Sequence, residues 1–261
     1  MEFWIETESL LKEFGGVVAV RDLSLRVPKG AAFGFLGANG AGKTTVVDML
    51  TTLSWPTAGR ARVLGFDTVR DAMEVRRNIG VVSDTDRPPL GHWEPLQYVS
   101  FFAELYGVDS AEAQSRAREA LAAMGLAKHL GRPIGSFSSG MRRKVDLVRA
   151  LVHRPRILFL DEPTRQLDIV ARSEFWRTLR AHHAAGTTIF LTSHDPAEVA
   201  AVCTHVGVLH EGRLLFQGEL AEFTGGEPSA EAVRDSMEKF IRRRAEFSVV
   251  GSDRATGSPR A

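Results

Sequence analysis

The segment at residues 37–44 constrains more than any other what this chain can fold into. It reads Gly-Ala-Asn-Gly-Ala-Gly-Lys-Thr and fits G-x-x-x-x-G-K-[ST], a glycine-rich turn that surrounds the phosphates of a nucleotide. Residues 31–36 before it read as a short buried strand, and residues 43–53 after it read as a helix. The sequence therefore predicts an α/β fold that holds a nucleotide between a strand and a helix.

Each residue type in this segment has a chemical reason to be there. Glycines let successive backbone N–H groups point at phosphate oxygens that no side chain could reach. Lys43 supplies positive charge for the β- and γ-phosphates, and Thr44 supplies a hydroxyl for Mg²⁺. The residues expected to bind the nucleotide are Gly37, Asn39, Gly40, Gly42, Lys43, Thr44 and Thr45.

Composition excludes several kinds of partner. The net charge is +1, from 33 Lys and Arg against 32 Asp and Glu, so no overall field favours a nucleic acid. The single cysteine, Cys203, fits a reducing compartment, and residues 1–6 lack the basic-then-apolar order of a signal peptide. No run approaches the roughly eighteen apolar residues of a membrane helix. We therefore expect a cytoplasmic chain whose membrane role, if it has one, requires a partner chain.

Short apolar segments alternate with helical ones along most of the chain. Strand-like runs at residues 157–160 and 188–192 flank a helical crossover at about residues 170–184, which indicates a mostly parallel sheet covered on both faces. The first 30 residues or so read as a small antiparallel β lobe. An Ala-, Glu- and Arg-rich helical insert is expected over about residues 92–154.

The end of the chain reads as a separate unit. A hairpin is expected from residues 206–209 and 213–216, and a Gly- and Pro-rich break follows residue 224. A last helix is predicted over about residues 230–244, with a frayed tail after Ser248. The predicted division is thus a main domain at residues 1–225 and a helix with a flexible tail at residues 226–261.

Two strand ends carry candidate catalytic groups. Residues 157–160 are apolar and run directly into Asp161 and Glu162, at the edge where parallel sheets gather ligand groups. Asp161 is expected to hold Mg²⁺, and Glu162 to polarise a water for in-line attack on the γ-phosphate. His194, just past the next strand, could contact the γ-phosphate. Taken individually, a solvated acidic turn and a structural histidine are the alternative readings.

Five segments together resemble the nucleotide-binding subunit of ABC transporters. The run Ser-Ser-Gly-Met-Arg-Arg-Lys at residues 138–144 is especially similar to the ATP-binding subunits of drug- and polysaccharide-type exporters. The resemblance covers about residues 7–225 and implies a P-loop NTPase fold. The matching segments, in chain order, are residues 37–45, 137–144, 157–164, 167–168 and 193–194.

This resemblance implies an ATPase that uses Mg²⁺ and powers export through a separate transmembrane permease, peripheral on the inner face of the membrane. It also implies a head-to-tail pair of chains that encloses two ATP, with Ser138 and Gly140 facing the nucleotide of the other copy. The residues agree, because Ser138 offers a hydroxyl beside the free N–H groups of a helix start. Phe14 falls where the family stacks an aromatic ring on adenine; packing within the core or the β lobe is the alternative. Asp168 falls where the family has a dimer-contacting acid.

The helix after Ser138 has an amphipathic pattern. Its apolar side is expected to face the core, and its basic residues are interpreted as a solvated face. The apolar residues are Met141, Val145, Val148 and Val152, and the basic ones are Arg142, Arg143 and Lys144.

The sequence also departs from the family pattern. Ser139 stands where a glycine is usual, and Arg165 and Gln166 replace a small residue and a glycine. Asp84 stands where the family places a metal-contacting glutamine, so it is a further candidate Mg²⁺ ligand; a polar loop residue without a metal role is the alternative. Two rival functions stay open: a soluble ABC ATPase with a regulatory or assembly role, and a module that binds nucleotide without hydrolysing it.

Overall fold

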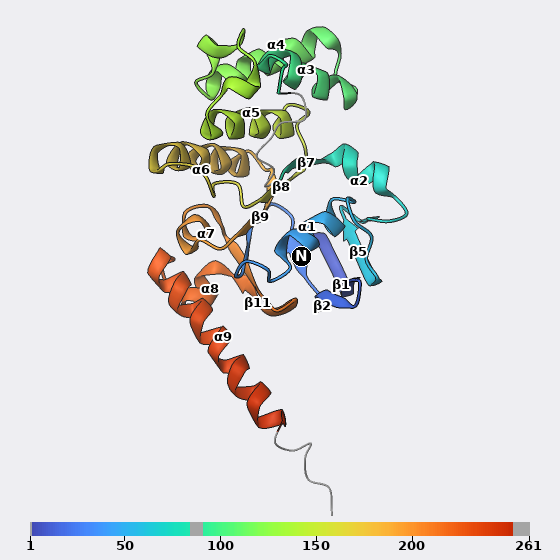
Figure 1. The fold of residues 1–261 in the computed structure, drawn as a ribbon, viewed down its shortest axis with the longest axis vertical. Coiled ribbons are helices and arrows are strands. Elements are labelled where there is room, and N and C mark those ends of the chain that lie inside the picture. The colour runs from blue at the N-terminus through green and yellow to red at the C-terminus, as the bar shows by residue number, and fades with distance from the viewer. Residues whose placement is uncertain (1, 84–90, 253–261) are drawn as a thin grey trace, which may run out of the picture.

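The structure is a computed structural model that describes residues 2–83 and 91–252, with side chains as far as residue 242. The described strands are β1 (Phe3–Phe14), β2 (Val17–Leu23), β3 (Arg26–Pro28), β4 (Ala32–Leu36), β5 (Ala58–Val63), β6 (Phe66–Asp67), β7 (Ile79–Val82), β8 (Ile157–Asp161), β9 (Thr188–Ser193), β10 (His205–His210) and β11 (Arg213–Glu219). The described helices are α1 (Lys43–Leu50), α2 (Ala72–Asn78), α3 (Pro95–Leu105), α4 (Ser110–Ala123), α5 (Ser139–Leu151), α6 (Ile169–Ala184), α7 (Pro196–Val202), α8 (Leu220–Thr224) and α9 (Ala230–Ser252). Figure 1 shows their arrangement.

A mostly parallel, six-stranded sheet runs through the molecule in the order β11-β10-β4-β9-β8-β7. The strands predicted at residues 31–36, 157–160 and 188–192 are confirmed as β4, β8 and β9. Leu36 pairs with Ser193 and Asp161 pairs with Thr192, so the carboxyl ends of these three strands lie side by side. The phosphate loop and both predicted catalytic segments therefore leave the sheet at the same edge.

A second, antiparallel sheet has the order β2-β1-β5-β6, with β3 also paired to β1. The lobe expected over the first 30 residues thus extends further in the structure, because β5 and β6 add residues 58–67. The sequence of β5, Ala-Gly-Arg-Ala-Arg-Val, is exposed over its first three residues and contains no apolar run that would mark it as a strand.

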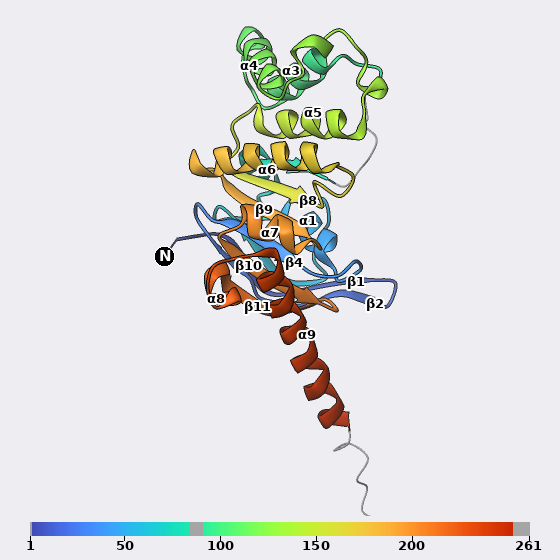
Figure 2. The ribbon, with the colours of Figure 1, turned by 90° about the vertical axis from the view of Figure 1, so that its left-hand side faces the viewer.

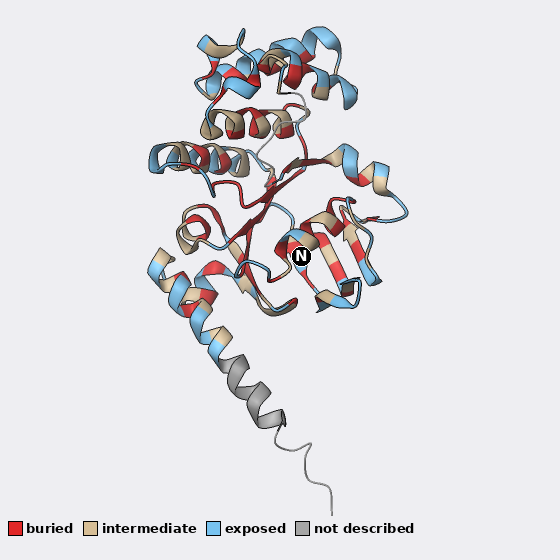
Figure 3. Ribbon diagram, viewed as in Figure 1, coloured by how far each residue is buried: buried red, intermediate tan, exposed pale blue. Residues whose placement is uncertain are grey.

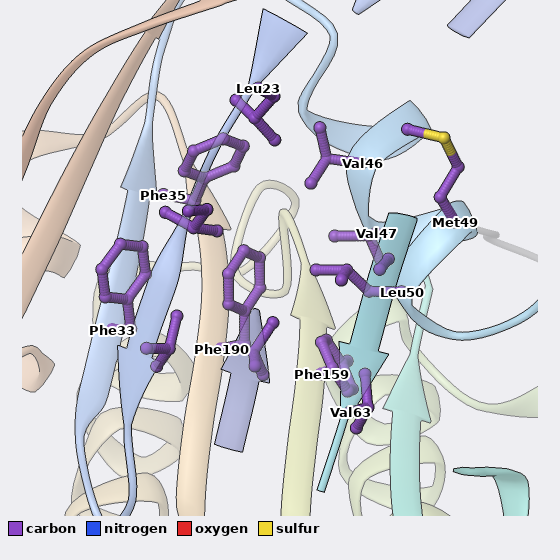
Figure 4. Packing of buried hydrophobic residues seen from close by; sticks show 14 of the residues in the cluster. Leu23, Phe33, Phe35, Val46, Val47, Met49, Leu50, Val63, Phe159 and Phe190 are labelled. Atoms are coloured by element: carbon purple, nitrogen blue, oxygen red, sulfur yellow. The ribbon is translucent and has the colours of Figure 1, made fainter. Parts of the chain in front are cut away.

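The main hydrophobic core lies where α1 packs between the two sheets (Figure 4). Phe190 stacks on Phe33 with ring centroids 5.5 Å apart and lies 5.5 Å from Phe159. Alternate residues of the same strands, such as Leu158 and Leu191, belong to a second core with α6 and α7. Figure 3 shows the resulting buried central strands. Because both faces are covered, these strands read as continuous apolar runs rather than as alternating ones.

The predicted helical insert contains α3, α4 and α5, which pack around a core of their own at one end of the molecule (Figure 2). Val145, Val148 and Val152 are buried in this small core, with Met141 packed against it. The prediction that the apolar face of α5 packs against a core is confirmed, and that core is the one within the helical insert.

The basic residues of α5 are not simply a solvated face, so this prediction is wrong in part. Side chains of α5 and the turn after it contact backbone carbonyls along β7, the edge strand of the parallel sheet. The contacts are Arg143 to Ser83 O (2.6 Å), Arg149 to Val81 O (2.8 Å) and His153 to Ile79 O (2.9 Å). Arg143 is buried as a result. Alternate carbonyls of a strand point to the same side, so α5 is held along the whole of β7.

The last helix, α9, is longer than predicted and continues to Ser252. No proline or glycine lies between Arg244 and Gly251, so nothing in that segment forces the helix to end. Val233 is buried in the core under α7 and α8, and Met237 and Phe240 pack against the same core. Figures 1 and 2 show the rest of α9 running away from the body of the molecule. Within the described part of the chain, no helix has the length and apolarity to cross a membrane.

Candidate functional site

The loop between β4 and α1 is shaped by its glycines. Gly40 and Gly42 have φ angles of 79° and 104°, in the left-handed region that favours glycine. A Cβ atom at Gly42 would lie 2.5 Å from Ala19 O, and one at Gly37 would lie 2.5 Å from Leu209 O. The glycines of the motif are therefore required by the conformation and the packing of the loop itself.

Lys43, Glu162 and His194 form a continuous chain of contacts beside this loop. Lys43 Nζ donates to Gly37 O at 2.7 Å and to Ala38 O at 3.1 Å, and it lies 3.1 Å from Glu162 Oε1. The other oxygen of Glu162, Oε2, lies 2.6 Å from His194 Nδ1. Lys43 and Glu162 are 6% and 8% exposed, whereas His194 is open to solvent. The structure thus brings together three residues that are 32 to 151 positions apart in the chain.

Glu162 is held in an uncommon backbone conformation with one oxygen incompletely satisfied. Its φ angle is 46°, and its N–H donates to Thr192 O at 3.2 Å and to Thr192 Oγ1 at 3.1 Å. Glu162 Oε1 is buried and has no hydrogen-bond partner among the described residues, so its contact with Lys43 is ionic and poorly aligned. A buried carboxylate oxygen of this kind can accept a proton from a water that enters the site.

Asp161 and Thr44 place two oxygen ligands next to each other. Thr44 Oγ1 donates to Asp161 Oδ2 at 2.8 Å, and Thr192 Oγ1 donates to Asp161 Oδ1. Burial and, to a smaller extent, the charge of Asp161 raise the pKa of the Asp48 carboxyl on α1. The described residues contain no group of three or more His, Cys, Asp or Glu poised to hold a metal. A hydroxyl and one carboxylate fit Mg²⁺, which keeps several waters and takes other ligands from phosphates.

The Ser138 segment lies at the start of α5, apart from this cluster. Ser138 Oγ accepts the N–H of Met141 at 3.2 Å and caps the helix, while its side chain stays exposed. Ser139 Oγ lies 3.4 Å from Gln166 O, so the hydroxyl that replaces a glycine bonds within its own chain. A hollow of about 180 Å³ lies here, lined among others by Ser138, Gly140 and Asp168. Nothing from the loop at residues 37–44 lines it.

The other predicted site residues lie in several places. Phe14, at the end of β1, is 53% exposed, and Lys12 Nζ lies 4.6 Å from the centroid of its ring, so Phe14 is not a core residue. Asn39 is exposed on the phosphate loop, and Thr45 is half-buried in the first turn of α1. Asp84 lies outside the described residues, so its role as a metal ligand stays a prediction.

Two residues near Asp161, namely Thr192 and Asp48, were not anticipated. Thr192 bonds to Asp161 and to the backbone of Glu162, and a threonine in the apolar run of β9 was the signal that could have revealed it. Asp48 lies four residues after Thr44 in α1, a spacing that puts both on one helix face.

Known proteins that are similar to this chain identify its family. Residues 20–165 match the ABC transporter family. The ABC transporter ATP-binding protein NatA of Bacillus subtilis is 36% identical over 87% of this chain and 92% of its own length. The daunorubicin/doxorubicin resistance ATP-binding protein DrrA of Streptomyces peucetius is 38% identical over 84% of this chain and 66% of its own length.

Solved structures share the fold. An ATP-binding subunit of an ABC transporter superposes with a TM-score of 0.82 at 24% identity and covers 91% of this chain and 99% of its own. CbiO1 of Clostridium perfringens, part of an ABC transporter complex, gives 0.77 at 26% identity over 95% of this chain and 96% of its own. The chain belongs to the ABC transporter family, as one of its ATP-binding, ATP-hydrolysing proteins.

Proposed function

We propose that this chain hydrolyses ATP to drive export of a substrate through a separate membrane-spanning chain. The observation that carries the proposal is the chain of contacts from Lys43 through Glu162 to His194, beside the phosphate loop at residues 37–44. Export is supported by the relatives, which include a drug-resistance ATP-binding protein and a bacitracin transport ATP-binding protein of Enterococcus faecalis, 35% identical over 85% of this chain.

We infer the roles of these residues toward ATP from their contacts. The ammonium of Lys43 is held against Glu162 and two loop carbonyls, and entering phosphates compete for the same charge. Once Lys43 turns to the phosphates, Glu162 Oε1 is free to accept a proton from the attacking water. His194, at 2.6 Å from Glu162 Oε2, orients that carboxylate and lies ready to contact the γ-phosphate.

Mg²⁺ would be held by the Thr44 hydroxyl and Asp161. The fit rests on the two adjacent oxygen ligands, with Asp161 fixed from behind by Thr192. When bound, the ion neutralises charge that develops on the phosphate oxygens. The exposed ring of Phe14 is proposed to stack on the adenine.

The complete site is proposed to need a second copy of the chain. Gly140 is not required by its own surroundings: a Cβ there would meet Ala171 Cβ at 3.6 Å and Leu167 Cδ2 at 3.7 Å, which are ordinary contacts. A glycine without a local reason is explained by the close approach of a ligand. Ile169 and Val170 directly follow Asp168, which lines the hollow beside Gly140. Their exposed fractions of 84% and 70% favour a partner chain over this surface.

A second exposed apolar surface supports a membrane-spanning partner. It comprises Leu53, Trp55, Val69 and Met73, which are 67%, 70%, 42% and 59% exposed. Leu53 and Trp55 follow α1, Val69 precedes α2, and Met73 lies in its first turn. A hydrogen bond of 2.6 Å from Arg76 Nε of α2 to Thr52 Oγ1 joins these two segments. We name this group the Trp55 surface and propose that it docks the permease.

Two measurements test the proposal. Phosphate release by the purified chain tests hydrolysis, and Glu162→Gln is expected to bind ATP, turn over very slowly and accumulate as a dimer in size-exclusion chromatography. Capture from detergent-solubilised membranes tests the partner: the wild type and Glu162→Gln are expected to retain a multi-span membrane protein that Trp55→Glu loses. Undiminished turnover by Glu162→Gln contradicts the catalytic assignment, and no difference between Trp55→Glu and wild type contradicts the docking surface.

A further inference from the structure

We propose that Glu198 is a positioning residue that fixes the loop carrying Glu162 relative to the loop carrying His194. The inference rests on the proposed roles of these two residues. Glu198 lies in the first turn of α7 and is only 1% exposed. It touches none of the groups proposed to contact ATP, so its influence on the reaction is indirect.

Three donors from three different elements converge on the Glu198 carboxylate. Thr164 Oγ1 donates to Oε1 at 2.7 Å, Trp176 Nε1 donates to the same oxygen at 3.1 Å, and Ser193 Oγ donates to Oε2 at 2.8 Å. Thr164 stands two residues after Glu162, and Ser193 stands directly before His194. The two oxygens of Glu198 therefore join the ends of β8 and β9 just behind the proposed catalytic pair, and Trp176 ties them to α6.

The bonds leave little freedom in either loop. A hydroxyl has one proton to donate, so directing the protons of Thr164 and Ser193 at Glu198 fixes both rotamers. Ser193 Oγ also accepts the N–H of Asp195 at 3.0 Å, which fixes the backbone on both sides of His194. Leu167 N donates to Thr164 O at 3.0 Å, so the same anchor extends to the segment that precedes Asp168.

Burying a carboxylate at this position costs desolvation free energy, which needs a reason such as holding two loops together. Burial raises the pKa of the Glu198 carboxyl, although the three donors act in the opposite direction. An apolar side chain of similar volume would fill the space without that desolvation cost. What an apolar residue cannot do is receive hydrogen bonds from two loops at the same time. The two loops must keep a fixed relative position because Glu162 Oε2, on one of them, lies 2.6 Å from His194 Nδ1 on the other.

The first test separates positioning from general stability. Glu198→Ala is expected to lower kcat for ATP by about ten- to a hundredfold while changing KM by less than about twofold, because the catalytic groups are misplaced but the phosphate loop is intact. Glu198→Gln keeps an acceptor oxygen and is expected to recover most of kcat. Val233→Ala, a buried truncation on α9 in the same core, serves as the control with unchanged kcat. Wild-type kcat in folded Glu198→Ala would overturn the proposal.

The second test uses the donors and remains decisive if Glu198→Ala does not fold. Thr164→Val and Ser193→Ala are each expected to lower kcat, and their combination to lower it by less than the product of the two effects, because either change breaks the same link. Effects that multiply in full contradict the link. Glu162→Gln is measured alongside: if it keeps its turnover, the proposed function fails, whereas if only Glu198 and its donors prove silent, this inference alone fails.

Discussion

The two halves of the proposed site differ in how far this chain builds them by itself. At the phosphate loop, Lys43 and Glu162 are almost fully buried and lie against each other, and Lys43 also donates to two carbonyls of the loop. At the start of α5, Ser138 is exposed, and the space next to Gly140 would accept a Cβ. The first half is thus preorganised for a small anion, while the second has a geometry that its own chain does not explain. Substitutions in the two halves should therefore have different effects on stability and on ATPase activity.

The largest effect is expected in the preorganised half. Lys43→Ala removes the buried cation and leaves Glu162 buried without its ion pair, so kcat/KM for ATP should fall by about a thousandfold or more. Phosphate release and binding of a fluorescent ATP analogue measure the loss. Lys29→Ala, which removes an exposed lysine paired with Glu2, is the matched control and should behave as wild type. A Lys43→Ala chain that still binds ATP tightly would speak against the phosphate-loop assignment.

A pair of glycine substitutions sharpens the contrast. Gly42→Ala forces a side chain to φ 104° and against Ala19 O, and should reduce the free energy of unfolding by about 1–3 kcal/mol as well as activity. Gly140→Ala meets only ordinary contacts and should leave thermal stability unchanged, yet lower ATPase activity by about tenfold because a ligand approaches there. Equal activity of Gly140→Ala and wild type at every chain concentration contradicts the role given to Gly140.

Thr44→Ala tests the metal ligands at smaller cost. The substitution removes the hydroxyl that bonds to Asp161, and the Mg²⁺ concentration for half-maximal ATPase activity should rise by about ten- to a hundredfold. Saturating Mg²⁺ should restore much of the rate. Thr45→Ala, its half-buried neighbour in α1, is the comparison variant and should shift the Mg²⁺ requirement less. An unchanged Mg²⁺ requirement in Thr44→Ala removes Thr44 from the site.

The smallest effect is expected on the helix cap at Ser138. Ser138→Ala loses the bond to Met141 N and should cost about 1 kcal/mol in the free energy of unfolding. Ser138→Asp keeps a capping oxygen and should keep that stability, but it places a negative charge where a phosphate is proposed to bind. Thermal melts and ATPase rates of the two variants therefore diverge. Activity that simply follows stability would mean that Ser138 is a cap and nothing more.

The sequence predicted best those elements that are determined by neighbouring residues in the chain. The central strands were readable because a sheet covered on both faces needs continuous apolar runs. The loop at residues 37–44 was readable because its residues are contiguous in the chain and Gly40 and Gly42 have positive φ angles. β5 was missed since its first three residues are exposed, it has no apolar run, and its pairing partner is a distant strand. The length of α9 was underestimated because the prediction followed the apolar face that packs on the core. The helix continues beyond that face, where no proline or glycine ends it before Gly251.

Within the site, what could not be predicted is what depends on contacts across the fold. Asp161 and Glu162 followed from their place at a strand end. The bond from Thr192 to Asp161, and those from Thr164 and Ser193 to Glu198, depend instead on how β8, β9 and α7 meet. Arg143 looked like a solvated cation on its helix, and only the position of β7 explains its burial. Side-chain chemistry is local, whereas the partner of a polar group is set by tertiary packing.

The most direct test of the account mixes two inactive chains. A Lys43→Ala chain keeps its Ser138 segment, and a Gly140→Asp chain keeps its phosphate loop, so a head-to-tail pair of the two contains one intact site. Each chain should be nearly inactive on its own, and an equimolar mixture should recover about a quarter of the wild-type ATPase rate, because half of the pairs are mixed and each has one site of two. A mixture as inactive as its components, with both chains folded and the Gly140→Asp chain still binding ATP, would contradict the claim that one site needs two copies.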